Sequence, residues 1–116
     1  MTWGEKQETM GPKQPREKNP EAGLAKVRSE RCCRVCGLDY GLQRHHLIPR
    51  SLMGADRDEN IIPLCLLCHE AFEHGTNRRE VAARIRAVLT VEEIGYVIGQ
   101  KSRVFLDSYY PQEARQ

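Results

Sequence analysis

The stretch CRVCGLDYGLQRHHLIPRSLMGADRDENIIPLCLLCHEAFEH, residues 33–74, decides the fold of this chain. A Cys-x-x-Cys pair opens it, CRVC, and a second pair, CLLC, lies near its end. Each pair places two thiolates on one tight turn, and Zn²⁺ prefers four such ligands in a tetrahedron. We therefore predict one structural zinc site, held by Cys33, Cys36, Cys65 and Cys68. Cys32 stands outside the Cys-x-x-Cys spacing and is interpreted as a packing residue or a spare thiol.

Length and composition bound the possible classes of protein. The 116 residues suit one domain, and an aromatic content of 6% indicates a thin core of the kind that depends on a structural metal. No apolar run approaches the ~18 residues of a membrane span, and the N-terminus lacks a signal-peptide pattern. We therefore expect a cytoplasmic protein without membrane contact, in which reduced thiols bind zinc. A thiol redox protein is disfavoured because the Cys pairs lack a neighbouring βαβ pattern.

The chain divides into a polar arm and one domain. Residues 1–22 are rich in Lys, Glu, Gln and Pro, so we predict a flexible arm there. Trp3 in this arm either docks on the domain or a partner, or is an incidental exposed residue. Residues 23–116 form the domain, with a short helix over 24–31, the core motif over 33–74 and a helical part over 76–110.

Local patterns within the core motif predict two short strands and a helix. We expect a strand over 44–48 that ends at Pro49, a loop over 50–60 and a second strand over 61–64. A helix follows from near Leu66 and ends at Gly75.

The last third of the chain is helical by pattern. Asn77 with Glu80 predicts one helix start, and Thr90 with Glu93 forms a capping box that opens a second helix. Four aromatic residues accompany these helices and fit a core or a lid better than a base-stacking surface. They are Tyr96, Phe105, Tyr109 and Tyr110.

His45 and His46 are adjacent on the first expected strand, and His69 follows on the expected helix. Neighbours on a strand point to opposite sides, so one histidine can bind a metal while the other faces a different partner. That arrangement suits metal-assisted hydrolysis, in which a cation stabilises charge on a phosphate and an imidazole takes a proton from water. The amide of Asn60 is a candidate for orienting that imidazole. The alternative is that the His-His pair is a polar turn.

The segments CRVCG, HHLIPRS and DENIIPLCLLCHEAFEHG together resemble the zinc-bearing branch of the HNH endonuclease family. The resemblance covers residues 33–74 and implies the ββα-metal fold of that family. We therefore expect an α+β domain in which the four-cysteine zinc site holds this motif together and C-terminal helices flank it. The tail TVEEIGYVIGQKSRVFLDSYYP is similar to the C-terminal helices of small phage and prophage members.

The resemblance also implies roles for single residues. His45 would be the first ligand of a catalytic cation and His69 the second, while His46 would be the general base. Asn60 would brace the loop and position His46. In some family members a histidine one helical turn further is an additional metal ligand. His74 lies five residues beyond His69, where three or four are expected, which makes it a weaker candidate for that ligand. The catalytic ion would be Mg²⁺ or Mn²⁺, and imidazole ligands also suit Ni²⁺, Co²⁺ or Zn²⁺.

DNA is the substrate that the resemblance implies. The net charge of +2 is too small to identify a nucleic-acid binder, but every cation over residues 28–86 is arginine, which suits phosphate oxygens. We expect Arg44, Arg50 and Arg78 to contact phosphates, although a solvated mixed-charge surface would show the same pattern.

The expected setting is the cytoplasm of a bacterium that carries a phage or prophage. There the protein would act in DNA packaging or restriction, directed by a terminase or another protein. The alternative function is a non-catalytic zinc module that binds DNA or a protein partner. The combination of His46, Asn60 and His69 favours the enzyme, because a binding module does not need all three.

Overall fold

The computed structural model describes residues 16–112. Its elements are α2 (Pro20–Glu30), β1 (Leu42–His46), the 3₁₀ turns η1 (Arg50–Leu52) and η2 (Asp58–Asn60), β2 (Ile61–Cys65), α3 (Leu66–His74), α4 (Arg78–Ala87), α5 (Val91–Gln100) and α6 (Arg103–Tyr109). The expected α+β class, with two antiparallel strands followed by a helix, is confirmed. Trp3 and the greater part of the expected arm lie outside the described residues.

The two strands form an antiparallel pair in which His45 lies opposite Ile62 and His46 opposite Ile61. β1 begins two residues earlier than the sequence predicts and ends at His46. Leu47 is still in register with Asn60, but the ladder ends there because the Leu47 carbonyl accepts from the Tyr110 hydroxyl. The Asn60 carbonyl accepts from Leu47 N, and the Asn60 side-chain oxygen accepts from Ile48 N. β1 therefore presents the two histidines at its end, next to a loop that Asn60 organises.

The helix boundaries follow from local signals in the chain. α2 begins at Pro20, earlier than expected, because proline is well suited to the first helical turn, where no N–H is needed. α3 begins at Leu66 as expected, directly after Cys65. It stops before Gly75, whose extended backbone (φ −76°) donates its N–H to the carbonyl of Ala71. The capping box of Thr90 and Glu93 is confirmed at the start of α5.

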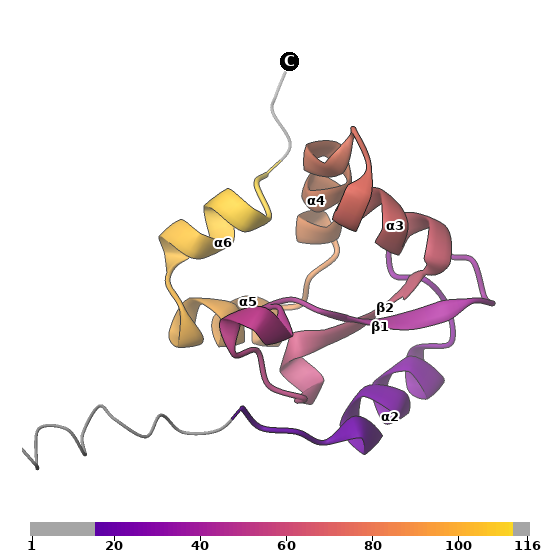
Figure 1. Ribbon diagram of the computed structural model, residues 1–116, viewed down its shortest axis with the longest axis horizontal. Coiled ribbons are helices and arrows are strands. Elements are labelled where there is room, and N and C mark those ends of the chain that lie inside the picture. The colour runs from indigo at the N-terminus through magenta and orange to yellow at the C-terminus, as the bar shows by residue number, and fades with distance from the viewer. Residues whose placement is uncertain (1–15, 113–116) are drawn as a thin grey trace, which may run out of the picture.

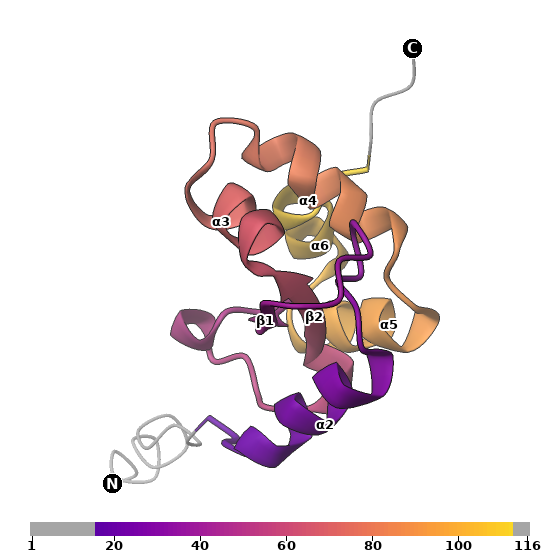
Figure 2. The same ribbon diagram turned by 90° about the vertical axis from the view of Figure 1, so that its right-hand side faces the viewer.

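The strand pair lies in the middle of the molecule. α2 covers one side of it, and α3, α4 and α6 lie on the other, as Figures 1 and 2 show from two directions. The core joins these layers through buried side chains that include Leu47, Ile62, Phe72 and Tyr110. Over the described residues, every helix is too short or too polar to cross a membrane.

A buried cluster of charges joins α2, the first Cys pair and α5. Glu93 is 2% exposed and accepts from Lys26 Nζ at 3.0 Å and from Arg34 Nη2 at 2.8 Å. Lys26 Nζ also donates to the carbonyl of Ile61 in β2 at 2.8 Å. Burial alone would raise the pKa of Glu93, but the bonds from Arg34, Thr90 and Lys26 outweigh it and lower the pKa to about 2. The cluster thus contains an ionised carboxylate with two cationic partners.

Candidate functional site

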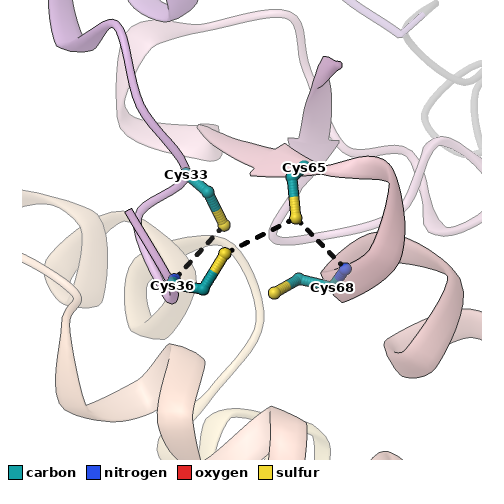
Figure 3. Close-up of side chains that lie close together, drawn as sticks. All are labelled: Cys33, Cys36, Cys65 and Cys68. Carbon is teal, nitrogen blue, oxygen red and sulfur yellow. Dashed lines mark hydrogen bonds between the residues drawn. The ribbon is translucent and has the colours of Figure 1, made fainter. Parts of the chain in front are cut away.

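The four cysteines of the two Cys-x-x-Cys pairs converge on one point. Their sulfur atoms all lie within 4.8 Å of one another, and Cys36 Sγ is 3.6 Å from Cys65 Sγ. Figure 3 shows the two pairs approaching from opposite sides, one from the knuckle before β1 and the other from the junction of β2 and α3. A tetrahedral Zn²⁺ with Zn–S bonds of about 2.3 Å places its sulfur ligands about 3.8 Å apart. The cysteine cluster therefore has the dimensions of a four-thiolate metal site, and Cys32 is not part of it.

Backbone groups and burial act on these thiols in opposite directions. The N–H groups of Cys36 and Cys68 point at Cys33 Sγ and Cys65 Sγ, each at 3.5 Å. Burial raises the pKa of Cys33, but backbone hydrogen bonds outweigh it and lower the pKa to about 7. Burial, followed by the neighbouring cysteines, raises the pKa of Cys68. Several thiolates this close together need a cation between them, so the chemistry of the cluster fits a metal.

A second cluster of possible metal ligands contains His45, His69 and Glu73. One ligand atom from each lies within 4.8 Å of the others. His69 and Glu73 are four residues apart and share one face of α3, and β1 supplies His45. His69 Nδ1 is 2.6 Å from the side-chain oxygen of Gln43, and His69 Nε2 is 3.7 Å from a carboxylate oxygen of Glu73. That second separation exceeds a hydrogen bond and leaves both atoms available to a shared cation.

His45 has the properties of a metal ligand. The residue is 2% exposed, and its ring packs edge-on against His69 and Phe72, with centroid distances of 5.3 and 5.0 Å. Burial lowers the pKa of His45 to about 3, so the ring is neutral at pH 7, as metal binding requires. Nε2 is 2.9 Å from the hydroxyl of Tyr110. Nδ1 is buried and has no hydrogen-bond partner among the described residues, which fits a lone pair reserved for a cation.

The neighbouring His46 points to the other side of β1 and meets an aspartate. Its Nε2 lies 2.8 Å from Asp56 Oδ1. The same carboxylate accepts from Arg16 Nη1 at 2.9 Å and from the backbone N–H of Asn19 at 2.8 Å. Burial raises the pKa of Asp56, but these bonds outweigh it and hold the pKa well below its usual value. Burial also lowers the pKa of His46, against the opposing effect of Asp56.

The ionised state of Asp56 determines which nitrogen of His46 carries the proton. A carboxylate only accepts hydrogen bonds, so the N–H of the neutral His46 ring must be at Nε2. His46 Nδ1 therefore carries the lone pair of the ring. This is the form of histidine that can take a proton from water.

Asn60 is fully buried and braces the loop between the histidines and η2. Its side-chain nitrogen donates to the carbonyls of Ile48 and Ala55 at 3.1 and 2.9 Å, and its oxygen accepts from Ile48 N at 2.8 Å. A Cβ atom at Gly54 would overlap the Ile48 carbonyl, so the loop needs glycine there. Asn60 has no hydrogen bond with His46, and it fixes the loop that continues into Asp56.

One cleft, with a volume of about 630 Å³, is lined both by the cluster of His45, His69 and Glu73 and by His46. Its walls include His45, His46, His69 and Glu73, together with side chains of α2 and η1.

The remaining residues predicted from the sequence are three arginines and His74. Arg44 and Arg50 line the cleft. Arg78 lies with its guanidinium over the rings of Phe72 and Tyr109, at 4.2 and 4.9 Å from their centroids. His74 is exposed and lies outside the His45 cluster, whose third member is Glu73.

Glu73, Asp56 and Tyr110 were not assigned to the site from the sequence. Glu73 could have been found from its spacing of four residues from His69 on a helix. Asp56 and Tyr110 had no comparable signal, because they meet the histidines through the tertiary fold.

Comparison with known families agrees with the core of this description. Residues 30–75 match the family model described as HNH endonuclease. The matched segment is about two fifths of the chain and contains both Cys pairs, both strands and α3. The expected resemblance is thus confirmed for this segment, and it indicates nuclease-type activity. No curated protein matches the chain.

Proposed function

We propose that this protein is a divalent-metal-dependent endonuclease that hydrolyses phosphodiester bonds of DNA. The observation that carries the proposal is the single cleft that His46 lines together with the ligand cluster of His45, His69 and Glu73. A nucleophile-activating base and a cation site on two sides of one cleft are the two parts that hydrolysis of a phosphate diester requires. The match of residues 30–75 to HNH endonucleases supports the same activity.

His45, His69 and Glu73 would hold the catalytic cation. When bound, the cation stabilises negative charge on the phosphate and on the leaving oxygen. Two imidazoles and one carboxylate suit Mn²⁺, Ni²⁺, Co²⁺ and Zn²⁺, and Mg²⁺ accepts the carboxylate with water molecules. Gln43 orients one of these ligands, because its side-chain oxygen accepts from His69 Nδ1 and leaves His69 Nε2 as the donor atom.

His46 would act as the general base. Its Nδ1 takes a proton from a water molecule, the water oxygen attacks phosphorus, and the bond from phosphorus to the leaving oxygen breaks. Asp56 keeps the N–H of the ring at Nε2, which holds the Nδ1 lone pair ready for this proton. Asn60 supports the arrangement by fixing the loop between Ile48 and Ala55.

The four cysteines would hold a structural Zn²⁺. The site connects the knuckle before β1 to the junction of β2 and α3, and α3 carries His69 and Glu73. A closed four-thiolate site has no open position for a substrate, so its contribution is to the folded state and not to the chemistry.

Arg44 and Arg50 would contact DNA phosphates at the mouth of the cleft, because both line it. Arg78 is oriented by two aromatic rings and would offer the free edge of its guanidinium to a phosphate. Such contacts predict DNA binding that weakens steeply with salt. Binding that is flat in salt would contradict a role for these arginines.

For the biological setting, we propose DNA packaging or restriction in the cytoplasm of a phage- or prophage-carrying bacterium. The support is the similarity of residues 90–111 to the C-terminal helices of small phage members. A terminase or another protein would direct the cleavage. Co-purification of the protein with a terminase, and faster cleavage in the presence of that terminase, would support packaging.

The experiment that tests the activity is plasmid cleavage by protein treated with EDTA and then supplied with Mg²⁺, Mn²⁺ or Ni²⁺. His46→Ala and His69→Ala should abolish metal-dependent cleavage while the zinc content is unchanged. His74→Ala is the matched control, since His74 is an exposed histidine on the same helix and outside the cluster. Equal inactivity of wild type and variants, with intact zinc and DNA binding, would favour the non-catalytic module.

A further inference from the structure

We propose that Tyr110, directly after α6, is a positioning residue of the catalytic cation site and fixes the tautomer in which His45 Nδ1 is the donor atom. The proposal rests on the proposed function in one respect, namely that His45 binds a cation. It adds a residue from the C-terminal part of the chain, outside the segment that matches HNH endonucleases.

The direction of two hydrogen bonds follows from the chemistry of the groups. The hydroxyl of Tyr110 is 2.7 Å from the backbone carbonyl of Leu47 and 2.9 Å from His45 Nε2. A carbonyl oxygen only accepts, so the single hydroxyl hydrogen of Tyr110 is donated to Leu47. The contact with His45 then needs a hydrogen from the ring, and Nε2–H donates to the tyrosine oxygen.

The other nitrogen of His45 is thereby determined. A neutral imidazole carries one N–H, so an N–H at Nε2 leaves a lone pair at Nδ1. Nδ1 is the one buried side-chain nitrogen or oxygen in the described part of the chain that has no hydrogen-bond partner. The opposite tautomer would bury an N–H without an acceptor and would bring the Nε2 lone pair against an oxygen lone pair. The hydrogen-bond chain from Leu47 through Tyr110 to His45 therefore prepares Nδ1 for a cation.

Packing holds the tyrosine in the position that this role requires. Tyr110 is fully buried, and its ring is stacked on Phe72 at a centroid distance of 5.6 Å and an angle of 8°. Its backbone carbonyl accepts from Arg86 Nη1 of α4 at 2.8 Å. Tyr110 is thus held in place by Phe72 of α3 and Arg86 of α4.

The first test is the tautomer of His45 in the metal-free site of the full zinc-loaded chain. Ring ¹⁵N chemical shifts report which nitrogen carries the proton. We expect Nε2–H for His45 in the wild type, and a dominant Nδ1–H form would overturn the proposal. This measurement needs no variant and therefore does not depend on whether a substituted chain folds.

The second test compares Tyr110→Phe with Tyr40→Phe, which removes a hydroxyl from a side chain that is 70% exposed. Calorimetric titration with Mn²⁺ or Ni²⁺ should show about 10- to 100-fold weaker binding for Tyr110→Phe, the usual effect of losing a partner behind a ligand. In this variant His45 should also populate both tautomers. Tyr40→Phe should bind as the wild type does. Unchanged affinity of a folded Tyr110→Phe would overturn the proposal.

Failure of the nuclease proposal would look different. Cation binding that depends on Tyr110 in a protein that never cleaves DNA would leave the inference standing and remove the enzyme. If Tyr110→Phe still cleaves DNA and binds the cation with unchanged affinity, the enzyme stands and the role of Tyr110 is overturned.

Discussion

Replacement of Asp56 by asparagine is the sharpest test of the proposed base. The carboxylate accepts from His46 and Arg16 at Oδ1 and from the Asn19 N–H at Oδ2. An amide has one oxygen, so it cannot accept on both sides. If the amide oxygen faces Asn19, its NH₂ group meets Arg16 and drives His46 to the tautomer with a lone pair at Nε2. If it faces His46, the NH₂ group meets the Asn19 N–H instead.

The expected effect is on the chemical step. General-base catalysis contributes about 10²- to 10⁴-fold, and the corresponding change in a Ser-His-Asp triad lowers kcat about 10⁴-fold through the wrong tautomer. We therefore expect Asp56→Asn to lower kcat by about 10²- to 10⁴-fold with little change in KM. The loss of charge-assisted bonds to Arg16 and Asn19 should lower the free energy of unfolding by about 2 kcal/mol.

The assay is steady-state cleavage of a plasmid at saturating Mn²⁺, with zinc content and cation affinity measured on the same samples. Asp58→Asn is the control, because Asp58 lies in the same loop with a side chain that is 73% exposed. Near wild-type kcat in a folded Asp56→Asn would refute the reasoning that Asp56 sets the tautomer of His46. In that case the ring ¹⁵N shifts of His46 in Asp56→Asn should show Nε2–H, as in the wild type.

Three further predictions concern the metals and the buried charges. Cys65→Ser should release zinc and unfold the domain. Atomic absorption should show the loss of zinc, and thermal unfolding should lose its cooperative transition. An unchanged Tm would contradict a structural metal. Glu73→Ala should weaken Mn²⁺ binding at least about 10-fold in calorimetry, by analogy with the loss of other groups that support a metal site. His74→Ala should bind Mn²⁺ as the wild type does. Weaker binding by His74→Ala than by Glu73→Ala would instead assign the third ligand to His74. Glu93 has its pKa lowered from 4.5 to about 2, so its stabilisation is complete above about pH 4.5 and is lost as the pH falls toward 2. The contribution of Glu93 to the free energy of unfolding is on the order of 3 kcal/mol. Between pH 4.5 and 2, the free energy of unfolding should therefore fall less steeply with pH in Glu93→Gln than in the wild type. Equal slopes for the two proteins would contradict this role of Glu93.

Much of the core motif could be predicted from the sequence because its signals are local. The spacing within each Cys pair, the start of α3 and the capping box of Thr90 and Glu93 all depend on residues within one turn of each other. The first strand was predicted two residues too late. Leu47 and Ile48 have the apolar character of a strand, but the Leu47 carbonyl bonds to Tyr110 and Ile48 N bonds to the Asn60 side chain, both distant in sequence.

The surroundings of the two histidines could not be predicted in the same way. Asp56 meets His46 from ten positions along the chain, and Tyr110 meets His45 across 65 positions. Neither distance leaves a periodic pattern that a sequence reading can detect. Arg16 reaches Asp56 from residues that composition assigned to a flexible arm, because a polar segment can be ordered by hydrogen bonds without an apolar stripe.

The cluster of Lys26, Arg34 and Glu93 has a consequence for how such sequences diverge. Removal of one member of a buried charge group costs about 3–5 kcal/mol, whereas replacement of the whole group by apolar side chains is often neutral. With a typical stability of about 5–15 kcal/mol, a small domain tolerates few changes of the first kind. Relatives that share this arrangement of α2 and α5 should therefore keep all three charges or lose them together. An alignment in which position 93 varies independently of positions 26 and 34 would show that the cluster does not constrain substitution.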